Sequence, residues 1–298
     1  MEARPARHYE GRSYSPTTRW LVRFGYDGSE FGGWARQPRV RTIEGVLRDG
    51  LRCRAIASTP EDAELEVASR TDRGVSARAN ALTLRTALDG PVLLRRLNTI
   101  APSLFFTAAA SVPAAFRVRG ATRRVYRYFD PRSYTDLAGV QAAAQLFRGR
   151  IDVRSFGRSI RRDAPQWRSV ESVAVTPTGS GQVVEVRALS FVWGMVRKIV
   201  GALREVDTGH LSTERLGAAI AGQERLTLPM AEPEGLVLWE VEFPLPWAVS
   251  WWGPNRHQAE FYRSACAAVW RRGHVVDALL DGGARPGPDR RGDGSPSE

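Results

Sequence analysis

Apolar residues recur along this chain with two different periods, and the order in which these periods alternate constrains the fold most. Apolar spacings of three and four residues predict helices, whereas apolar runs and strict alternation predict strands. Helices are expected at residues 42–56, 92–97, 136–147, 195–206, 212–221 and 258–271. Strands are expected at residues 20–26, 104–112, 122–130, 169–176, 183–189 and 235–243, with shorter strand-like runs at 65–68 and 81–84.

The two parts of the chain share one pattern, which is strand, helix, strands, helix, strand. Adjacent strand pairs with helices between them predict an α+β fold of two similar halves, each an antiparallel sheet covered by helices on one face. Such a sheet leaves a broad face free, as RRM-like sheets do when they bind RNA. The expected segments are a disordered tail at 1–16, the two halves at 17–121 and 122–244, a Trp/Arg-rich and partly helical extension at 245–280, and a disordered tail at 281–298.

The chain is strongly basic, with a formal net charge of +11. Polyanions are the natural partners of such a protein, and RNA and DNA are the leading ones. The basic side chains are almost all arginine, because Lys198 is the only lysine. Arginine suits bidentate phosphate contacts and stacking on bases. GC-rich coding produces the same bias, so a basic protein without a nucleic-acid role stays open at this point.

Several functional classes have no suitable residues in the sequence. No Gly-rich phosphate loop precedes Lys198 and no G-x-G-x-x-G follows a strand, so neither a P-loop nor a Rossmann cofactor site is expected. Cys53 and Cys266 are far apart and the four histidines lack ligand spacing, so no metal site is expected. No apolar run approaches the length of a membrane span, and the N-terminus lacks an apolar signal core. We therefore expect a cytoplasmic protein without a membrane partner.

The stretch Ser69–Ala77 holds a single acid, Asp72, between Arg70 and Arg73, and Arg78 follows directly after it. The strand-like runs on both sides place this stretch on a connection at the end of a strand. A carboxylate among guanidinium groups stays ionised at neutral pH, which suits a nucleophile. A plain salt bridge within a loop is the alternative interpretation.

A Gly-rich loop at residues 27–38 carries Trp34, Arg36 and Gln37. Aromatic rings stack on bases, and arginine and glutamine side chains contact phosphates, so the loop is a candidate RNA contact. The alternative is that Phe31 and Trp34 fix the loop to the hydrophobic core. The residues alone do not decide between the two.

The helix expected at 195–206 carries Arg197 on a face that also holds Gly194 and Gly201. Glycine within a helix costs about 1 kcal/mol relative to alanine. A helix tolerates this cost where another backbone or a ligand comes close. The alternative is that the glycines serve helix packing and that Arg197 is solvated. On the strand at 122–130, alternation places Tyr126 and Tyr128 on one face.

Taken in order, these motifs resemble the TruA family of tRNA pseudouridine synthases. The R-T-D-x-G-V block followed by M-V-R-x-I-V-G is the specific part of the resemblance. The matching residues are Tyr26-Asp27-Gly28 with Phe31, Gly33-Trp34 and Gln37-Pro38; Thr42-Ile43-Glu44-Gly45; Arg70-Thr71-Asp72-Arg73-Gly74-Val75; Arg124 with Tyr126-Arg127-Tyr128; Phe191; Met195-Val196-Arg197-Lys198-Ile199-Val200-Gly201; and Pro233-Glu234-Gly235-Leu236.

The resemblance implies conversion of uridine to pseudouridine in the anticodon stem-loop of tRNA, at tRNA positions 38–40, by a cofactor-free homodimer with the tRNA lying across both subunits. By position, Asp72 matches the catalytic aspartate, Tyr126 the tyrosine packed against the target base, and Arg197 the basic residue paired with the aspartate. Arg70 matches an arginine that holds the flipped-out nucleotide, and the loop then forms the floor of a cleft between the halves. The RNA-binding candidates are Arg70, Arg73, Arg78, Trp34, Arg36, Gln37, Arg124 and Lys198.

The chain departs from the bacterial pattern of this family at three positions of the loop. Ser69, Arg73 and Ser76 stand where bacterial members have Gly, Ala and His, which is more similar to archaeal and eukaryotic members. The rival hypothesis from another functional class is a non-catalytic RNA-binding protein on RRM-like sheets. A pure binder needs no carboxylate in a site that faces phosphates, where it repels RNA. Asp72, Tyr126 and Arg197 together therefore favour the enzyme.

Overall fold

The structure is a computed structural model that describes residues 17–59, 61–158, 166–250 and 255–280. It divides into two compact units, Met1–Gly253 and Pro254–Glu298. The second unit contains helix α6 (Arg256–Leu280), which extends beyond the expected range of 258–271. The Asn255 side chain accepts a hydrogen bond from the backbone N–H of Gln258 and so caps this helix. The expected disordered tails lie outside the described residues, as do Trp251 and Trp252.

One mixed sheet of ten strands runs through the first unit, in the order β10-β4-β1-β3-β9-β5-β8-β7-β6, with β2 paired to β3 beside this path. The strands are β1 (Thr18–Tyr26), β2 (Glu66–Val67), β3 (Ser76–Thr86), β4 (Leu104–Ser111), β5 (Arg123–Asp130), β6 (Gly149–Asp152), β7 (Trp167–Thr178), β8 (Gly181–Ala188), β9 (Leu236–Glu242) and β10 (Val249–Ser250). Neighbouring strands are antiparallel except β3 and β9. This one parallel pairing joins Ser76–Ala77 to Val237–Leu238 and connects the N-terminal strands to the C-terminal ones.

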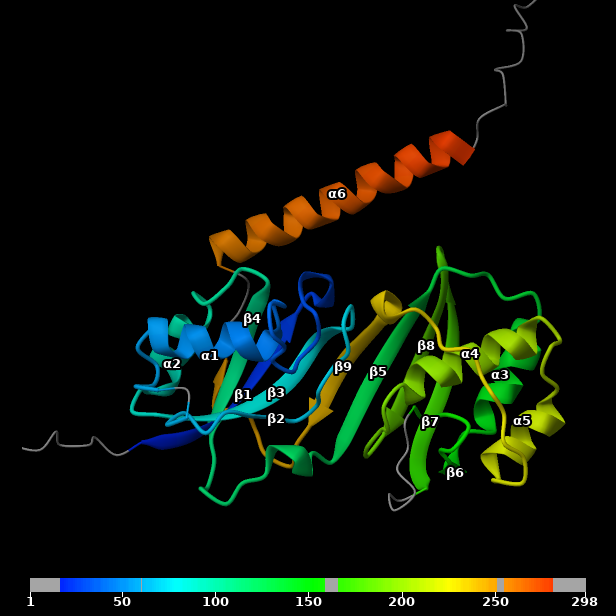
Figure 1. Cartoon of the computed structure of the whole chain (residues 1–298), viewed down its shortest axis with the longest axis horizontal. Coiled ribbons are helices and arrows are strands. Elements are labelled where there is room, and N and C mark those ends of the chain that lie inside the picture. The colour runs from blue at the N-terminus through cyan, green and yellow to red at the C-terminus, as the bar shows by residue number, and fades with distance from the viewer. Residues whose placement is uncertain (1–16, 60, 159–165, 251–254, 281–298) are drawn as a thin grey trace, which may run out of the picture. The chain divides into compact units, whose positions relative to one another are not determined.

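Five helices of the first unit lie on the same side of this sheet, as Figure 1 shows. They are α1 (Ile43–Cys53), α2 (Gly90–Leu97), α3 (Leu137–Gln145), α4 (Met195–Asp207) and α5 (Thr213–Ile220). Four of them begin at a residue whose side chain accepts a backbone N–H of the first turn, namely Thr42, Asp89, Asp136 and Ser212. Within the described residues, no helix combines the length and the apolar character needed to cross a bilayer.

The α+β class expected from the sequence is confirmed, because helices and a largely antiparallel sheet form separate layers. The two short strands β6 and β10 were not among the expected elements. Each is too short for alternation to be visible, and each exists through its pairing, with β7 and β4 respectively. The described strands join in one sheet, and the finer expectation of two similar RRM-like halves stays a prediction.

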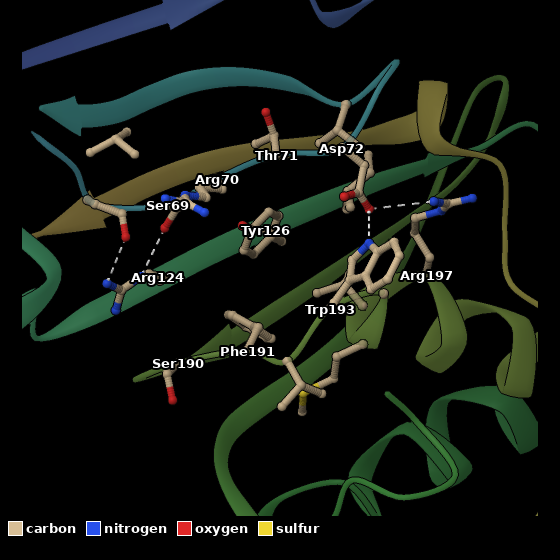
Figure 2. A pocket seen from close by; sticks show the side chains of 18 of the residues that line it. Ser69, Arg70, Thr71, Asp72, Arg124, Tyr126, Ser190, Phe191, Trp193 and Arg197 are labelled. Atoms are coloured by element: carbon tan, nitrogen blue, oxygen red, sulfur yellow. Dashed lines mark hydrogen bonds and ion pairs between the residues drawn. The ribbon is translucent and has the colours of Figure 1, made fainter. Parts of the chain in front are cut away.

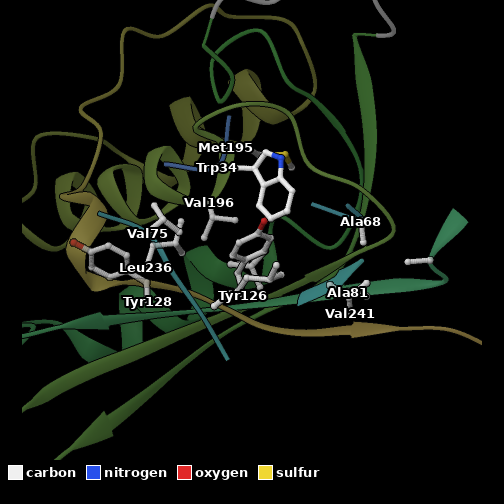
Figure 3. Close-up of a cluster of buried hydrophobic side chains, with 14 of the residues drawn as sticks. Trp34, Ala68, Val75, Ala81, Tyr126, Tyr128, Met195, Val196, Leu236 and Val241 are labelled. Carbon is white, nitrogen blue, oxygen red and sulfur yellow. The ribbon is translucent and has the colours of Figure 1, made fainter. Parts of the chain in front are cut away.

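The buried hydrophobic residues form one cluster, part of which packs against the strands of the sheet (Figure 3). Side chains from segments far apart in sequence meet there, among them Trp34, Val75, Tyr126, Val196 and Leu236. All five are less than a tenth exposed. Val75 follows the Asp72 loop, Val196 lies at the start of α4, and Tyr126 lies on β5. The core therefore packs together the elements that carry the three proposed catalytic side chains.

A buried ion pair ties the far end of α4 to the end of β5. Arg204 donates two hydrogen bonds to the Asp130 carboxylate, at 2.8 and 3.0 Å, and one to Glu232 at 2.8 Å. The Asp130 side chain is fully buried, and the Arg204 side chain is only 9% exposed. The Tyr134 hydroxyl also donates to Asp130, at 3.0 Å. Breaking such a pair leaves an uncompensated buried charge, which is strongly destabilising.

We expect Arg204→Met to lower the free energy of unfolding by about 3–5 kcal/mol, because Asp130 loses its cation while remaining buried. The matched control is Arg215→Met on α5. Arg215 pairs with Glu224 at the surface, with its side chain 56% exposed. Exposed pairs contribute about 0–1 kcal/mol. Urea unfolding followed by circular dichroism measures both variants, and equal losses in the two would contradict the structural role given to Arg204.

Candidate active site

The Asp72 loop connects β2 to β3 and is held by contacts to β1 and to the Gly-rich loop. The Thr71 carbonyl accepts the backbone N–H of Trp34 at 3.0 Å, and the Thr71 hydroxyl lies 2.8 Å from the hydroxyl of Tyr26. The backbone N–H of Val75 donates to the Asp72 carbonyl at 3.2 Å and closes the turn. The residues on both sides of Asp72 are therefore fixed.

A pocket of about 540 Å³ opens beside this loop (Figure 2). Its wall includes Ser69, Arg70, Asp72, Tyr126, Trp193 and Arg197. These residues come from the β2–β3 loop, from β5, and from α4 with the segment before it. The structure thus places the three side chains expected to act in catalysis, Asp72, Tyr126 and Arg197, around one pocket.

One oxygen of the Asp72 carboxylate receives two contacts, both visible in Figure 2. The indole N–H of Trp193 donates to Oδ2 at 2.9 Å, and a guanidinium nitrogen of Arg197 lies 3.8 Å from the same atom. Oδ1 accepts no hydrogen bond from the part of the chain that the structure describes. The Asp72 side chain is 35% exposed. The carboxylate is thus held through one oxygen while remaining accessible from the pocket.

Two glycines on either side of Arg197, Gly194 and Gly201, help helix α4 to direct Arg197 toward Asp72. Gly194 caps the helix in a left-handed conformation, with φ of +76°. A Cβ at Gly201 would lie 2.1 Å from the Pro229 carbonyl oxygen, so the chain after α5 crosses the helix closely there. The same crossing segment supplies the Ala231 carbonyl, which accepts the Nε–H of Arg197 at 2.6 Å. Arg197 is 12% exposed and held at both ends of its guanidinium.

Tyr126 is buried at the base of the pocket, and its ring packs edge-on against Phe191 with centroids 5.0 Å apart. Burial raises the pKa of the Tyr126 hydroxyl to about 12, although nearby Arg124 acts to lower it. The hydroxyl is therefore neutral at physiological pH. A neutral phenol can stack through its ring and can donate a proton in a hydrogen bond.

Arg124 lies on the other side of the pocket and acts as a bridge between segments. It donates to the Ser69 hydroxyl at 3.0 Å and to the carbonyls of Ala68 at 3.2 Å and Leu189 at 2.5 Å. Burial lowers the pKa of the Arg124 guanidinium. With its donors engaged within the protein, Arg124 fixes Ser69 at the start of the Asp72 loop.

The other RNA-binding candidates lie in different settings. Arg70 is exposed in the pocket wall, and Arg73, Arg36 and Gln37 are exposed on the loops. Arg78 stacks over Trp239 at 4.7 Å and pairs with Glu240.

Trp34 is only 4% exposed and packs against Phe24. That position favours the alternative in which it fixes the Gly-rich loop to the core. Lys198 donates to two backbone carbonyls.

Trp193 is the site residue that the sequence reasoning missed. It stands one residue before the cap of α4 and is half exposed, so neither periodicity nor an apolar stripe marks it. The guanidinium of Arg158 lies 4.8 Å from its ring. Its position two residues before the M-V-R-x-I-V-G block, which begins at Met195, was the only available signal.

Comparison with known proteins supports the resemblance noted in the sequence. A family model described as tRNA pseudouridine synthase matches residues 143–244. The chain is 38% identical over 226 residues to tRNA pseudouridine synthase A of Thermococcus kodakarensis, covering 75% of this chain and 84% of that protein. It is 36% identical over 228 residues to the protein of that name from Pyrococcus furiosus, covering 76% of this chain and 84% of the other. The chain belongs to the tRNA pseudouridine synthase family.

A more divergent relative is tRNA pseudouridine synthase A of Methanothermobacter thermautotrophicus, 33% identical over 224 residues, covering 74% of this chain and 80% of that protein. Pseudouridine synthases are isomerases, so the chain is an enzyme of the class expected from the motifs. The described His, Cys, Asp and Glu residues form no group of three that could hold a metal ion.

We expect Trp193→Phe to slow pseudouridine formation by about tenfold or more, because a hydrogen bond to a charged group contributes about 1.5–3 kcal/mol. Phenylalanine keeps a ring against Arg158 but removes the donor to Asp72. The measurement is the single-turnover rate on an unmodified tRNA transcript with enzyme in excess. Trp193→His, which restores an N–H donor, should recover part of the rate.

The control for this substitution is Trp167→Phe on β7. Trp167 is exposed and stacks with Arg150, and it does not line the pocket. A normal rate for Trp193→Phe would show that the indole N–H does not hold Asp72 for the reaction.

Proposed function

We propose that this chain isomerises uridine to pseudouridine in the anticodon stem-loop of tRNA, with Asp72 as the nucleophile. The observation that carries the proposal is a half-accessible carboxylate held through one oxygen by Trp193 and Arg197, in a pocket that also contains Tyr126. A protein that only bound RNA would gain nothing from a carboxylate beside phosphates. Relatives that cover most of the chain carry the name tRNA pseudouridine synthase A.

The reaction is redox-neutral and its atoms balance within the nucleotide. The bond between N1 of uracil and C1′ of ribose breaks, and a bond between C5 and C1′ forms. C5 loses its proton and N1 gains one. The carboxylate of Asp72 supplies the nucleophile, at C6 of the base or at C1′ of the ribose. Splitting one difficult step into two easier ones is the ordinary advantage of covalent catalysis.

Arg197 and Tyr126 have complementary roles in this proposal. The guanidinium fixes the rotamer of the Asp72 carboxylate, because it lies 3.8 Å from Oδ2 and is itself held by the Ala231 carbonyl. The Tyr126 ring offers a flat apolar surface to the uracil. Its hydroxyl, with a pKa of about 12, stays protonated throughout the physiological range and can take part in proton transfer only as a neutral phenol.

A uracil within a stem must leave the helix to reach Asp72, at a cost of a few kcal/mol. Exposed Arg70, in the pocket wall, is placed to stack on the flipped nucleotide or fill the gap it leaves. Exposed Arg73 and Arg36 are placed for phosphate contacts. The proposal keeps the finer expectations that the resemblance implies, namely two RRM-like halves with the site in a cleft between them, and a cytoplasmic homodimer that binds the tRNA across both subunits.

We expect Asp72→Asn to abolish pseudouridine formation while leaving tRNA affinity unchanged or slightly higher, because the amide is isosteric but is not a nucleophile. The assay incubates the protein with unmodified tRNA transcripts and maps pseudouridine by chemical labelling, which also locates the target uridine. Asp49→Asn is the matched control, since Asp49 is exposed on α1. Turnover by correctly folded Asp72→Asn would refute the nucleophile.

We expect Arg197→Met to lower the single-turnover rate by about a hundredfold or more while leaving tRNA affinity nearly unchanged, because the buried end of the carboxylate loses its cation. Arg197→Lys keeps the charge but not the contact geometry, so its single-turnover rate should lie between those of the wild type and Arg197→Met. A near-normal rate for Arg197→Met would refute the pairing. Circular dichroism of each variant shows whether the fold is retained.

A further inference from the structure

Three cations gather beside the pocket. They are Arg158 in the loop after β6, Lys198 on α4, and Arg225 in the segment after α5. None of the three forms an ion pair with a carboxylate in the part of the chain that the structure describes. We call these three residues the cation cluster.

Lys198 is fixed at the centre of this cluster. Its ammonium group donates to the carbonyls of Ser155 at 3.1 Å and Gly157 at 3.2 Å. An ammonium group has three donors, and the described residues accept from two of them, at these carbonyls. The Ser155 hydroxyl accepts the backbone N–H of Leu226 at 3.0 Å, which fixes the segment that carries Arg225. The cluster is therefore built on a rigid base.

The mutual effect of the three charges is visible in the pKa of Lys198. Burial lowers this pKa most, and repulsion from Arg225 and Arg158 lowers it further. Asp152 is close enough to Arg225 for its own pKa to be affected, but its salt bridge is with Arg154, at 2.6 Å. Like charges held close together disfavour the folded state, and such arrangements are common at binding sites.

The cation cluster borders the catalytic pocket through Trp193. The Arg158 guanidinium lies 4.8 Å from the Trp193 ring, and the backbone N–H of Arg158 donates to the Trp193 carbonyl at 2.8 Å. The indole of Trp193 in turn contacts Asp72. An anion held by the cluster thus lies next to the place where the target nucleotide is bound.

We propose that Arg158, Lys198 and Arg225 bind a backbone phosphate of the RNA adjacent to the flipped uridine. This inference rests on the proposed function and names a contact that fixes the register of the substrate over the pocket. A phosphodiester brings a negative charge to the three cations, accepts hydrogen bonds from the two arginines, and accepts from the third donor of Lys198. The contact is independent of base identity.

The test measures tRNA binding rather than turnover. Arg158→Met and Arg225→Met each remove one charge, and filter binding of an unmodified tRNA transcript is followed across salt concentrations. Each variant should bind about threefold to tenfold more weakly near physiological salt, and the slope of log affinity against log salt should fall by up to about one. The double variant should lose less than the sum of the two, because both arginines contact one phosphate.

Arg215→Met is the matched control, since it removes the same charge from the same part of the chain, at an exposed ion pair. Thermal unfolding provides a second readout, which distinguishes phosphate binding from a structural role for Arg225. Removing Arg225 relieves repulsion, so its melting temperature should stay equal or rise. Wild-type affinity and slope in both single variants, or effects no larger than those of Arg215→Met, would overturn the proposal.

Two further outcomes distinguish the RNA phosphate site from the proposed catalytic function and from a site for free phosphate. If the variants lose tRNA affinity as expected but the wild-type protein forms no pseudouridine, the proposed function is refuted and the phosphate site is still supported. Inorganic phosphate is the second probe. If it raises the melting temperature of the wild type but not of the double variant, while tRNA binding is the same in both, the site takes free phosphate and its assignment to RNA is wrong.

Discussion

The pocket depends on a short parallel pairing between β3 and β9. Only Ser76 with Val237 and Ala77 with Leu238 form it, and Leu238 is paired on its other side with Tyr126 of β5. Asp72 lies just before Ser76, so backbone hydrogen bonds through β9 fix the carboxylate loop relative to the tyrosine. A parallel pair needs a long connection between its strands, so this register brings together segments that are far apart in the chain. The remaining member, Arg197, comes from helix α4, which packs against β5.

Helix α4 is placed by contacts two turns apart. Arg197 and Arg204 are separated by seven residues, which places them on nearly the same side of the helix. Arg204 is locked to buried Asp130 at the end of β5, while Gly201 between them lets the Pro229 backbone cross the helix. Sliding or rotating α4 along β5 would therefore break a buried charge pair before it moved Arg197 away from Asp72. The 3.8 Å contact at the site is maintained by a structural ion pair at the other end of the helix.

Much of the fold could be predicted from local sequence signals. The elements that could not be predicted are those that form only by pairing with segments distant in the chain. The helix beginning after Thr42 has its cap, its acidic first turn and its apolar stripe within one short segment. By contrast, β6 is a strand only because β7 lies beside it. At the site, motif order indicated Asp72, Tyr126 and Arg197, but the Trp193 contact joins residues 121 positions apart and left no local trace. Burial was also needed to favour a packing role for Trp34 over base stacking.

Net charge alone does not show where an RNA-binding surface lies on this protein. Many of its arginines are matched by acids on the sheet, including Arg23 with Glu240, Arg127 with Glu185 and Arg123 with Glu242. Arg127 also stacks on Trp239 at 4.0 Å, so this network is satisfied internally and has little charge left for phosphate. The cation cluster differs because its charges repel one another and form no ion pair with the described carboxylates. In a chain of net charge +11, unmatched cations therefore locate a binding site better than the density of arginine does.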